Sequence, residues 1–383
     1  MHPRLPRALA ALVAAALLLP AIAACQPSPA APTAAPPPTT APAPKPASPA
    51  ASPAASPAAS PAASPSPSPA VKPAASPAAA ASPSPVAVQR PVAPPAPTGN
   101  QKGSSSNPIN MAFVPSADSQ KVLASGEPLG KMLGDVTNLT FRVSVPTSYT
   151  AVIEAMGANQ VDVGWLAPFA YVLAHDKNGS QVILASLRQG SKTYRSQVVV
   201  RADSGITSLD QLRGKKFAFV EPASASGFLF PNALLAQRGI DYKTFFSDTI
   251  FAGGHDKVII AVYNKQVDGG ASFGNNIDTG PPTDARTLVR STLPEVMEVV
   301  RPIAQTDPIP NDTVSVRRGL DDNLTRLIRD GLLYVQSTDD GKKALRDLYG
   351  IDGLGPAEDR DYDAVRNAAK ALNLDLEEQI APK

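Results

Sequence analysis

Apolar positions from residue 107 onward follow two spacings that alternate along the chain. Short runs rich in β-branched and aromatic residues predict strands at 109–114, 139–145, 161–166, 182–187, 197–201, 216–220 and 267–272. Segments with apolar residues three or four positions apart predict helices at 119–133, 150–158, 168–175, 228–238, 256–265, 320–336, 342–348 and 362–372. Such alternation is typical of parallel sheets covered by helices, so the expected fold class is α/β.

The alternation occurs twice and a helical tail follows it, which predicts two lobes. We expect residues 107–198 together with 312–383 to form lobe 1, and residues 199–311 to form lobe 2. The strands near 197–201 and 313–317 are the expected crossings between the lobes. A hinge at the crossings would let the lobes close on a ligand that contacts both of them.

The first 25 residues have the pattern of an export signal. Basic residues precede an apolar run at 8–21, and small residues follow it, which predicts a signal peptide at 1–24. The tetrapeptide Ile22-Ala23-Ala24-Cys25 resembles the lipobox of bacterial lipoproteins, which implies that Cys25 is acylated; a plain secretory signal is the alternative. The apolar run is short for a membrane-spanning helix. Lipid would then hold the protein at the membrane, on its extracytoplasmic face.

Residues 25–106 have the composition of a linker. The first 106 residues contain no acidic and no aromatic residue, and residues 26–100 hold 24 of the chain's 42 prolines. Proline removes backbone donors and favours polyproline II, so we expect a disordered, semi-rigid stalk rich in Ala, Pro and Ser. Such a stalk would separate the folded part from the membrane.

Charge and composition exclude several function classes. The folded part has 29 basic and 33 acidic residues, a net charge of −4, whereas a nucleic-acid-binding face needs the opposite sign. Cys25 is the only cysteine, which excludes a disulfide within the chain and a thiol nucleophile in the folded part. His2, His175 and His255 are too few for a histidine-rich metal site. We expect no metal, no cofactor and no nucleic-acid partner.

Four strand-to-helix junctions carry the candidate ligand-binding residues. Ligands of α/β sheets bind beyond the carboxyl ends of the strands, where helix N-termini present free N–H groups. The junctions lie at 147–149, 165–168, 221–227 and 253–256, with the candidate side chains Tyr149, Trp165, Ser224, Ser226 and His255. Each has a structural alternative: the hydroxyls as helix caps, the aromatic rings as core, and the histidine as a capped or solvent-facing residue. Their joint placement favours a small anion bound by hydroxyls and amides.

These junctions belong to longer segments that resemble one family. The segments are 161–168 with Tyr171, 212–216, 219–227, 254–256 and 309–311. They are similar to the phosphate, phosphite and phosphonate substrate-binding proteins of ABC transporters, and the resemblance extends over nearly all of 108–372. It implies a two-lobe periplasmic-binding-protein fold of the type II class, a small-molecule phosphorus oxyanion as ligand, and an ABC permease with its ATPase as partners. It also implies a binding protein rather than an enzyme, and we expect a monomer.

The resemblance also implies roles for single residues. The family's turn that holds the phosphonate oxygens falls on Ser224, Ala225, Ser226 and Gly227, its ligand-binding histidine on His255, and a tyrosine over the ligand on Tyr149. Ala225 stands where relatives often carry a hydroxyl. Residues 269–276 lack the acidic residue that some relatives use for an aminoalkyl substituent. That departure favours phosphite, methylphosphonate or phosphate over an aminophosphonate.

Two other functions fit parts of the sequence. A sensory module that presents a bound anion to a membrane receptor would have the same lobes. A serine hydrolase would use Ser224 or Ser226 as nucleophile with His255 as base. The sequence has no Gly-x-Ser-x-Gly elbow and no clear third member of such a triad.

Overall fold

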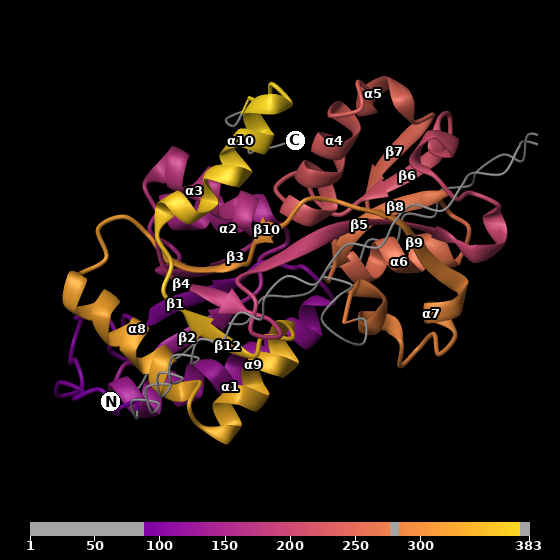
Figure 1. Ribbon diagram of the computed structural model, residues 1–383. Helices are drawn as coiled ribbons and strands as arrows, with labels where there is room; N and C mark the ends of the chain where they lie inside the picture. Colours follow the sequence, from indigo (N-terminus) through magenta and orange to yellow (C-terminus); the bar gives the residue numbers. More distant parts are fainter. Residues whose placement is uncertain (1–87, 276–282, 376–383) are drawn as a thin grey trace, which may run out of the picture. The chain divides into compact units, whose positions relative to one another are not determined.

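The computed structural model describes residues 88–275 and 283–375, whose strands form two sheets (Figure 1). The predicted signal peptide, Cys25 and the predicted linker as far as residue 87 lie outside the described residues. Within the two described ranges, every helix is too short or too polar to cross a membrane.

The first sheet has the strand order β12-β4-β11-β3-β1-β2. Its strands are β1 (Ile109–Phe113), β2 (Phe141–Ser144), β3 (Val163–Leu166), β4 (Gln181–Leu187), β11 (Thr313–Val316) and β12 (Gly353–Gly355). Its helices are α1 (Ser119–Thr137), α2 (Tyr149–Gly157), α3 (Pro168–Asn178), α8 (Asp322–Val335) and α9 (Asp339–Tyr349). One apolar core cluster joins α1, α8 and α9 to the sheet, and another contains α2 and α3, so helices cover both faces.

The second sheet has the order β10-β5-β8-β6-β7, and β9 pairs with β5. Its strands are β5 (Thr193–Arg201), β6 (Lys216–Phe219), β7 (Asp248–Phe251), β8 (Gly269–Gly274), β9 (Val300–Gln305) and β10 (Ile309–Pro310). Its helices are α4 (Phe230–Ala236), α5 (Tyr242–Phe245), α6 (His255–Tyr263) and α7 (Val296–Val299). Near the C-terminus, α10 (Asp363–Ala371) contacts α3 and α4, and thus helices associated with both sheets.

The predicted α/β fold class is confirmed, but the sheets are mixed rather than parallel. In the first sheet β1 is parallel to β2 and β3, whereas β11 is antiparallel to β3 and β4. In the second sheet β6 is parallel to β7 and β8, whereas β5 is antiparallel to β8 and β9. The antiparallel strands include those by which the chain leaves one sheet and returns to it, an arrangement that hydrophobic spacing does not show.

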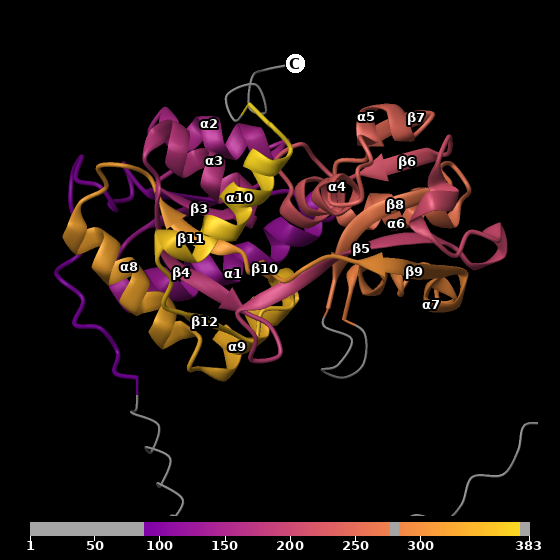
Figure 2. The same cartoon turned by 45° about the horizontal axis from the view of Figure 1, so that its top comes forward.

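The chain passes between the sheets at 188–192 and at 311–312. The first crossing joins β4 to β5, and the second joins β10, which pairs with β5, to β11 (Figure 2). The predicted crossings at 197–201 and 313–317 were wrong. Residues 197–201 pair with strands of the second sheet, and residues 313–316 pair with strands of the first. Residue 198, the predicted limit of lobe 1, lies inside β5. The apolar runs mark the strand interiors, while the crossings themselves are polar.

The packed structure begins before residue 107. Ser104 is 3% exposed, and the Lys102 ammonium lies 2.6 Å from the carboxylate of the fully buried Asp162. The amide of Asn138 donates to the Pro94 carbonyl at 3.0 Å. The last part of the predicted linker therefore packs against the first sheet and its helices, through contacts to residues far along the chain that composition does not reveal.

Candidate functional site

A pocket lies where the two sheets meet, at the N-termini of α2 and α6. It is lined by residues from both sheets and from the crossings: Val114, Ser116, Ala117, Tyr149, Trp165, Leu166, Ala167, Arg188, Tyr194, Ser224, Ser226, His255, Phe273, Asn275, Leu288, Asp312, Leu348 and Tyr349. Its volume is about 80 Å³, enough for roughly five to eight water-sized groups. A ligand of this size has few non-hydrogen atoms.

The loop from Ser224 to Gly227 follows β6 and is held close to the end of that strand. The Ser224 hydroxyl accepts a hydrogen bond from the Gly227 N–H at 3.0 Å, and the Val220 N–H donates to the Gly227 carbonyl at 3.1 Å. A Cβ at Gly227 would lie 2.3 Å from a methyl group of Val220, so only glycine fits here. The buried Ser196 hydroxyl donates to the Ser226 carbonyl at 2.5 Å. These contacts fix the loop before any ligand arrives.

The four predicted residues of this loop do not all face the pocket. Ser224 and Ser226 line it, whereas Ala225 and Gly227 are buried outside the lining. Ser224 also caps the turn, as the structural alternative predicted, because its side-chain oxygen accepts a hydrogen bond from the turn. Its O–H can still donate to a group in the pocket. The Ser226 side chain hydrogen-bonds the Tyr194 hydroxyl. Ser224 and Ser226 thus contribute hydroxyl groups, and Ala225 and Gly227 contribute the backbone shape.

His255 begins α6 and presents a neutral donor to the pocket. Its Nδ1 accepts from the Phe273 N–H at 3.3 Å and lies 2.8 Å from Ser272 Oγ, which leaves the ring proton on Nε2. Burial lowers the pKa of His255 to about 3, and the positive charge of Arg188 acts in the same direction. At neutral pH the ring is therefore uncharged, and its Nε2–H is a donor without a hydrogen bond to any described residue.

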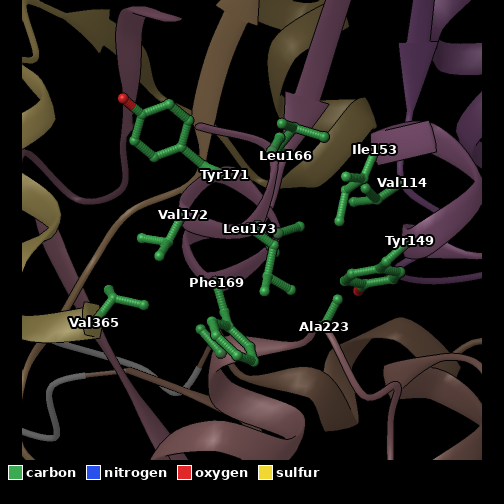
Figure 3. Close-up of a cluster of buried hydrophobic side chains, with 14 of the residues drawn as sticks. Val114, Tyr149, Ile153, Leu166, Phe169, Tyr171, Val172, Leu173, Ala223 and Val365 are labelled. Carbon is green, nitrogen blue, oxygen red and sulfur yellow. The ribbon is translucent and has the colours of Figure 1, made fainter. Parts of the chain in front are cut away.

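Tyr149 supplies a second donor from the opposite side. It is the first residue of α2, which Ser148 caps by accepting from the Ala151 N–H at 3.0 Å. The side chain is fully buried, and its hydroxyl oxygen has no hydrogen-bond partner among the described residues. Burial raises the pKa of Tyr149 well above its usual value, so the hydroxyl keeps its proton. Figure 3 shows the Tyr149 ring beside Ala223, the residue before Ser224. Because this buried hydroxyl has no partner among the described residues, it can donate to a group bound in the pocket.

Trp165 lines the pocket without offering it a polar group. Its indole N–H donates to the Met111 sulfur at 3.4 Å, and its ring stacks on Phe113 with centroids 5.4 Å apart. Trp165 therefore belongs to the core and also lines the pocket. Its N–H bonds within the core, as the structural alternative predicted.

Several polar residues of the lining were missed by the sequence reasoning, Arg188, Tyr194 and Asp312 among them. These three come from the crossings and the strands beside them. The lining does contain an acidic residue, Asp312, but it lies outside the segment 269–276 and follows directly on the segment 309–311. The strand-end rule, applied to the strand predicted at 182–187, would have found Arg188, whereas no strand was predicted directly before Asp312.

Two hydrogen bonds connect the two sides next to the pocket. The His255 backbone N–H donates to the Ser116 carbonyl at 2.9 Å, from α6 to the loop after β1. The Tyr149 backbone N–H donates to the Glu221 carboxylate, from α2 to the loop after β6. Burial raises the pKa of Glu221 to about 7, against the opposing effect of Lys257 and of this hydrogen bond. The structure thus holds the two sides together around the pocket.

Comparison with known proteins gives the family. Residues 111–362 match the family model described as the periplasmic substrate-binding protein of a phosphonate ABC transporter. The chain belongs to this family. The phosphate-import protein PhnD of Mycolicibacterium smegmatis is 35% identical over 180 residues, which are 44% of this chain and 56% of that protein. The phosphonates-binding periplasmic protein of Escherichia coli K12 is 26% identical over 249 residues, 63% of this chain and 70% of that protein.

Solved structures show the same fold. A binding-protein component of a phosphonate ABC transporter from Pseudomonas aeruginosa superposes with a TM-score of 0.62 at 24% identity, over 71% of this chain and 92% of that one. PhnD1 from Prochlorococcus marinus, solved in complex with methylphosphonate, superposes with a TM-score of 0.61 at 18% identity, over 69% of this chain and 98% of that one. The predicted two-lobe fold of the type II periplasmic-binding-protein class is confirmed.

The hydrolase alternative has no support in this family of binding proteins. The homologues are substrate-binding proteins of ABC transporters, not enzymes. Among the described residues, neither Ser224 nor Ser226 hydrogen-bonds His255, whose Nδ1 is occupied by Phe273 and Ser272. The binding protein instead presents hydroxyl and imidazole groups as donors.

Proposed function

We propose that this chain captures a small phosphorus oxyanion, namely a phosphonate, phosphite or phosphate, between its two lobes and delivers it to an ABC importer. The observation that carries the proposal is the set of donors in one small pocket. The Tyr149 hydroxyl and the His255 Nε2–H come from opposite sides and lack partners among the described residues, and the hydroxyls of Ser224 and Ser226 lie in the same lining. Hydrogen-bond donors that converge in one small pocket suit an anion with several oxygens.

The proposal extends to how the ligand acts on the lobes. A ligand that accepts from Tyr149 on one side and from Ser226 and His255 on the other binds fully only when the sides meet. It therefore favours the closed arrangement over an open one. The choice of ligand is supported by the names of two relatives, a phosphate-import protein and a phosphonates-binding periplasmic protein.

Substitution of Tyr149 by Phe tests the site, because it removes one unpartnered oxygen and little else. Since a hydrogen bond to a charged group contributes about 1.5–3 kcal/mol, Tyr149→Phe should weaken methylphosphonate or phosphate binding about 10-fold or more without lowering the thermal midpoint. Tyr171→Phe is the matched control, since that hydroxyl donates to Asp359 at 2.8 Å and lies outside the pocket lining. Calorimetry that finds equal affinities in wild type and Tyr149→Phe, or no binding of any phosphorus oxyanion to wild type, contradicts the proposal.

We also propose that the protein is a monomer anchored by lipid at Cys25, with signal peptide 1–24 removed and lobes joined to the membrane through the linker. Cys25→Ser should move the protein from the membrane fraction to the soluble extracytoplasmic fraction. Retention of the variant in the membrane fraction would show that another element anchors it.

A further inference from the structure

Arg188 and Asp312 form an ion pair in the lining of the pocket. Arg188 Nη2 lies 2.5 Å from Asp312 Oδ2, and the two side chains are 19% and 22% exposed. The same guanidinium donates from Nε to the Tyr349 carbonyl at 3.2 Å and from Nη1 to the Asn311 side chain at 3.3 Å. Its carbon Cζ lies 5.9 Å from the centre of the Tyr194 ring. Three directed bonds fix the orientation of the guanidinium.

The two crossings between the sheets position this pair. Arg188 follows β4 and makes a backbone bridge to Ser191 in the first crossing, and Asp312 lies in the second. The fully buried Asn311 side chain donates to the carbonyls of Ser186 and Ser191 at 3.0 and 2.9 Å, which ties the crossings together. The ion pair is therefore built into the framework at the hinge and does not depend on a ligand.

Asp312 is the one carboxylate in the pocket lining among the described residues. An unpaired carboxylate beside an anion site would attract an ammonium group on the ligand, because an ion pair in a partly desolvated pocket is strong. Here the guanidinium already occupies Asp312 and adds a positive charge that repels a second cation. The Tyr149 hydroxyl and the His255 Nε2–H, which have no hydrogen bond to any described residue, stay available to the oxyanion.

We infer that Arg188 determines ligand specificity: by pairing with Asp312 it excludes phosphonates with a cationic substituent and admits phosphorus oxyanions whose fourth group is small and uncharged. This inference rests on the proposed function and narrows its substrate class. Arg188 acts here as a specificity residue through its contact with Asp312, so its effect lies in the ratio of two affinities rather than in binding as such.

Calorimetry with ethylphosphonate and 2-aminoethylphosphonate tests the inference, because these ligands differ by one ammonium group. Wild type should bind ethylphosphonate at least about 10-fold more tightly. Arg188→Met keeps an unbranched side chain in place of the arginine stem and removes the guanidinium charge, which frees Asp312. The ratio of the two affinities should then move by at least about 10-fold towards 2-aminoethylphosphonate.

Three further variants separate charge from structure. Arg188→Lys keeps the positive charge and should keep the wild-type ratio. The double variant Arg188→Met with Asp312→Asn should lose the gain for 2-aminoethylphosphonate, because no carboxylate remains. Asp312→Asn alone leaves the Arg188 guanidinium without its carboxylate partner and should increase the preference for ethylphosphonate. This measurement tests the inference even if Arg188→Met does not fold.

The outcomes distinguish this inference from the proposed function. If wild type binds neither phosphonate nor phosphate, the proposed function fails. If wild type binds them but holds 2-aminoethylphosphonate as tightly as ethylphosphonate, or if Arg188→Met and Asp312→Asn leave the ratio at its wild-type value, the inference fails while the proposed function stands.

Discussion

The neutral state of His255 makes a prediction about stability that needs no ligand. The ring is 6% exposed, accepts from the Phe273 N–H, and has its pKa lowered to about 3 by burial. In the unfolded chain an ordinary histidine titrates near pH 6.5. Between these two values the unfolded chain binds a proton that the folded protein does not. The free energy of unfolding should therefore fall as the pH falls below about 6.5.

The magnitude follows from the two pKa values. At pH 7.5 both states hold a neutral ring, so His255 contributes almost no pH dependence. At pH 5.0, the unfolded ring is protonated and the folded ring is not, which removes about 2 kcal/mol of stability relative to pH 7.5. His255→Gln abolishes this contribution while leaving a side chain that can accept from the Phe273 N–H. The wild-type free energy of unfolding minus that of the variant should decrease by about 2 kcal/mol from pH 7.5 to 5.0.

Urea denaturation of ligand-free wild type and His255→Gln at several pH values measures this difference. Glu221→Gln is a control of opposite sign, since burial raises the pKa of Glu221 to about 7 and the folded protein then binds the extra proton. The wild-type value minus that of Glu221→Gln should increase from pH 7.5 to 5.0, because the contribution of a raised carboxyl is lost as the pH rises through about 7. A wild-type to His255→Gln difference that stays constant within about 0.5 kcal/mol refutes the buried neutral ring.

Three substitutions test the framework around the pocket. Gly227→Ala places a Cβ 2.3 Å from one methyl group and 2.4 Å from the Cβ of Val220. The free energy of unfolding should fall by about 1–3 kcal/mol, which calorimetric unfolding measures. Adding Val220→Ala should not restore stability, because alanine keeps the Cβ. Ser196→Ala removes the 2.5 Å hydrogen bond to the Ser226 carbonyl. We expect the free energy of unfolding to fall by about 1–2 kcal/mol and phosphate binding to weaken. Unchanged affinity would show that Ser196 does not support the binding site. Lys102→Met leaves the buried Asp162 with the Arg317 guanidinium at 2.9 Å and the Asn110 N–H at 2.8 Å. Because one of its cationic partners is lost, the variant should be destabilised by about 1–3 kcal/mol in urea. Lys131→Met, whose partner Asp135 is exposed, is its control and should have little effect.

Much of the fold could be predicted because apolar residues within its main strands and helices recur at the spacing typical of each element. The expected strands at 161–166 and 216–220 correspond to β3 and β6, and the helix expected at 168–175 corresponds to α3. The strand β7 was missed because all four of its residues are exposed, so it has no buried face to produce alternation. The helix predicted at 228–238 begins as a wide turn at 225–229, because Ser224 caps it and Gly227 packs against Val220.

The grouping of three proposed donors in one pocket could be predicted from the topology. Tyr149, Ser226 and His255 each stand where a strand gives way to a helix, and the topology of an α/β sheet brings such positions together. Arg188 and Asp312 stand 124 residues apart in the two crossings, and no local pattern connects them. Their pairing depends on β4 and β11 lying side by side in the first sheet, which is a property of the assembled fold.

The distribution of charge explains why no basic cluster marks this site in the sequence. His255 and Tyr149 are neutral donors, and the positive charge of Arg188 is matched by Asp312 at 2.5 Å. Since residues 107–383 have a net charge of −4, attraction of the proposed anion has to come from oriented dipoles and desolvated hydrogen bonds at the helix N-termini. Such bonds depend on the positions of the ligand oxygens, whereas a bare positive charge would accept any anion. If the proposed function holds, a pocket built in this way gains selectivity for tetrahedral oxyanions through geometry, and those bonds form only where the two sides meet.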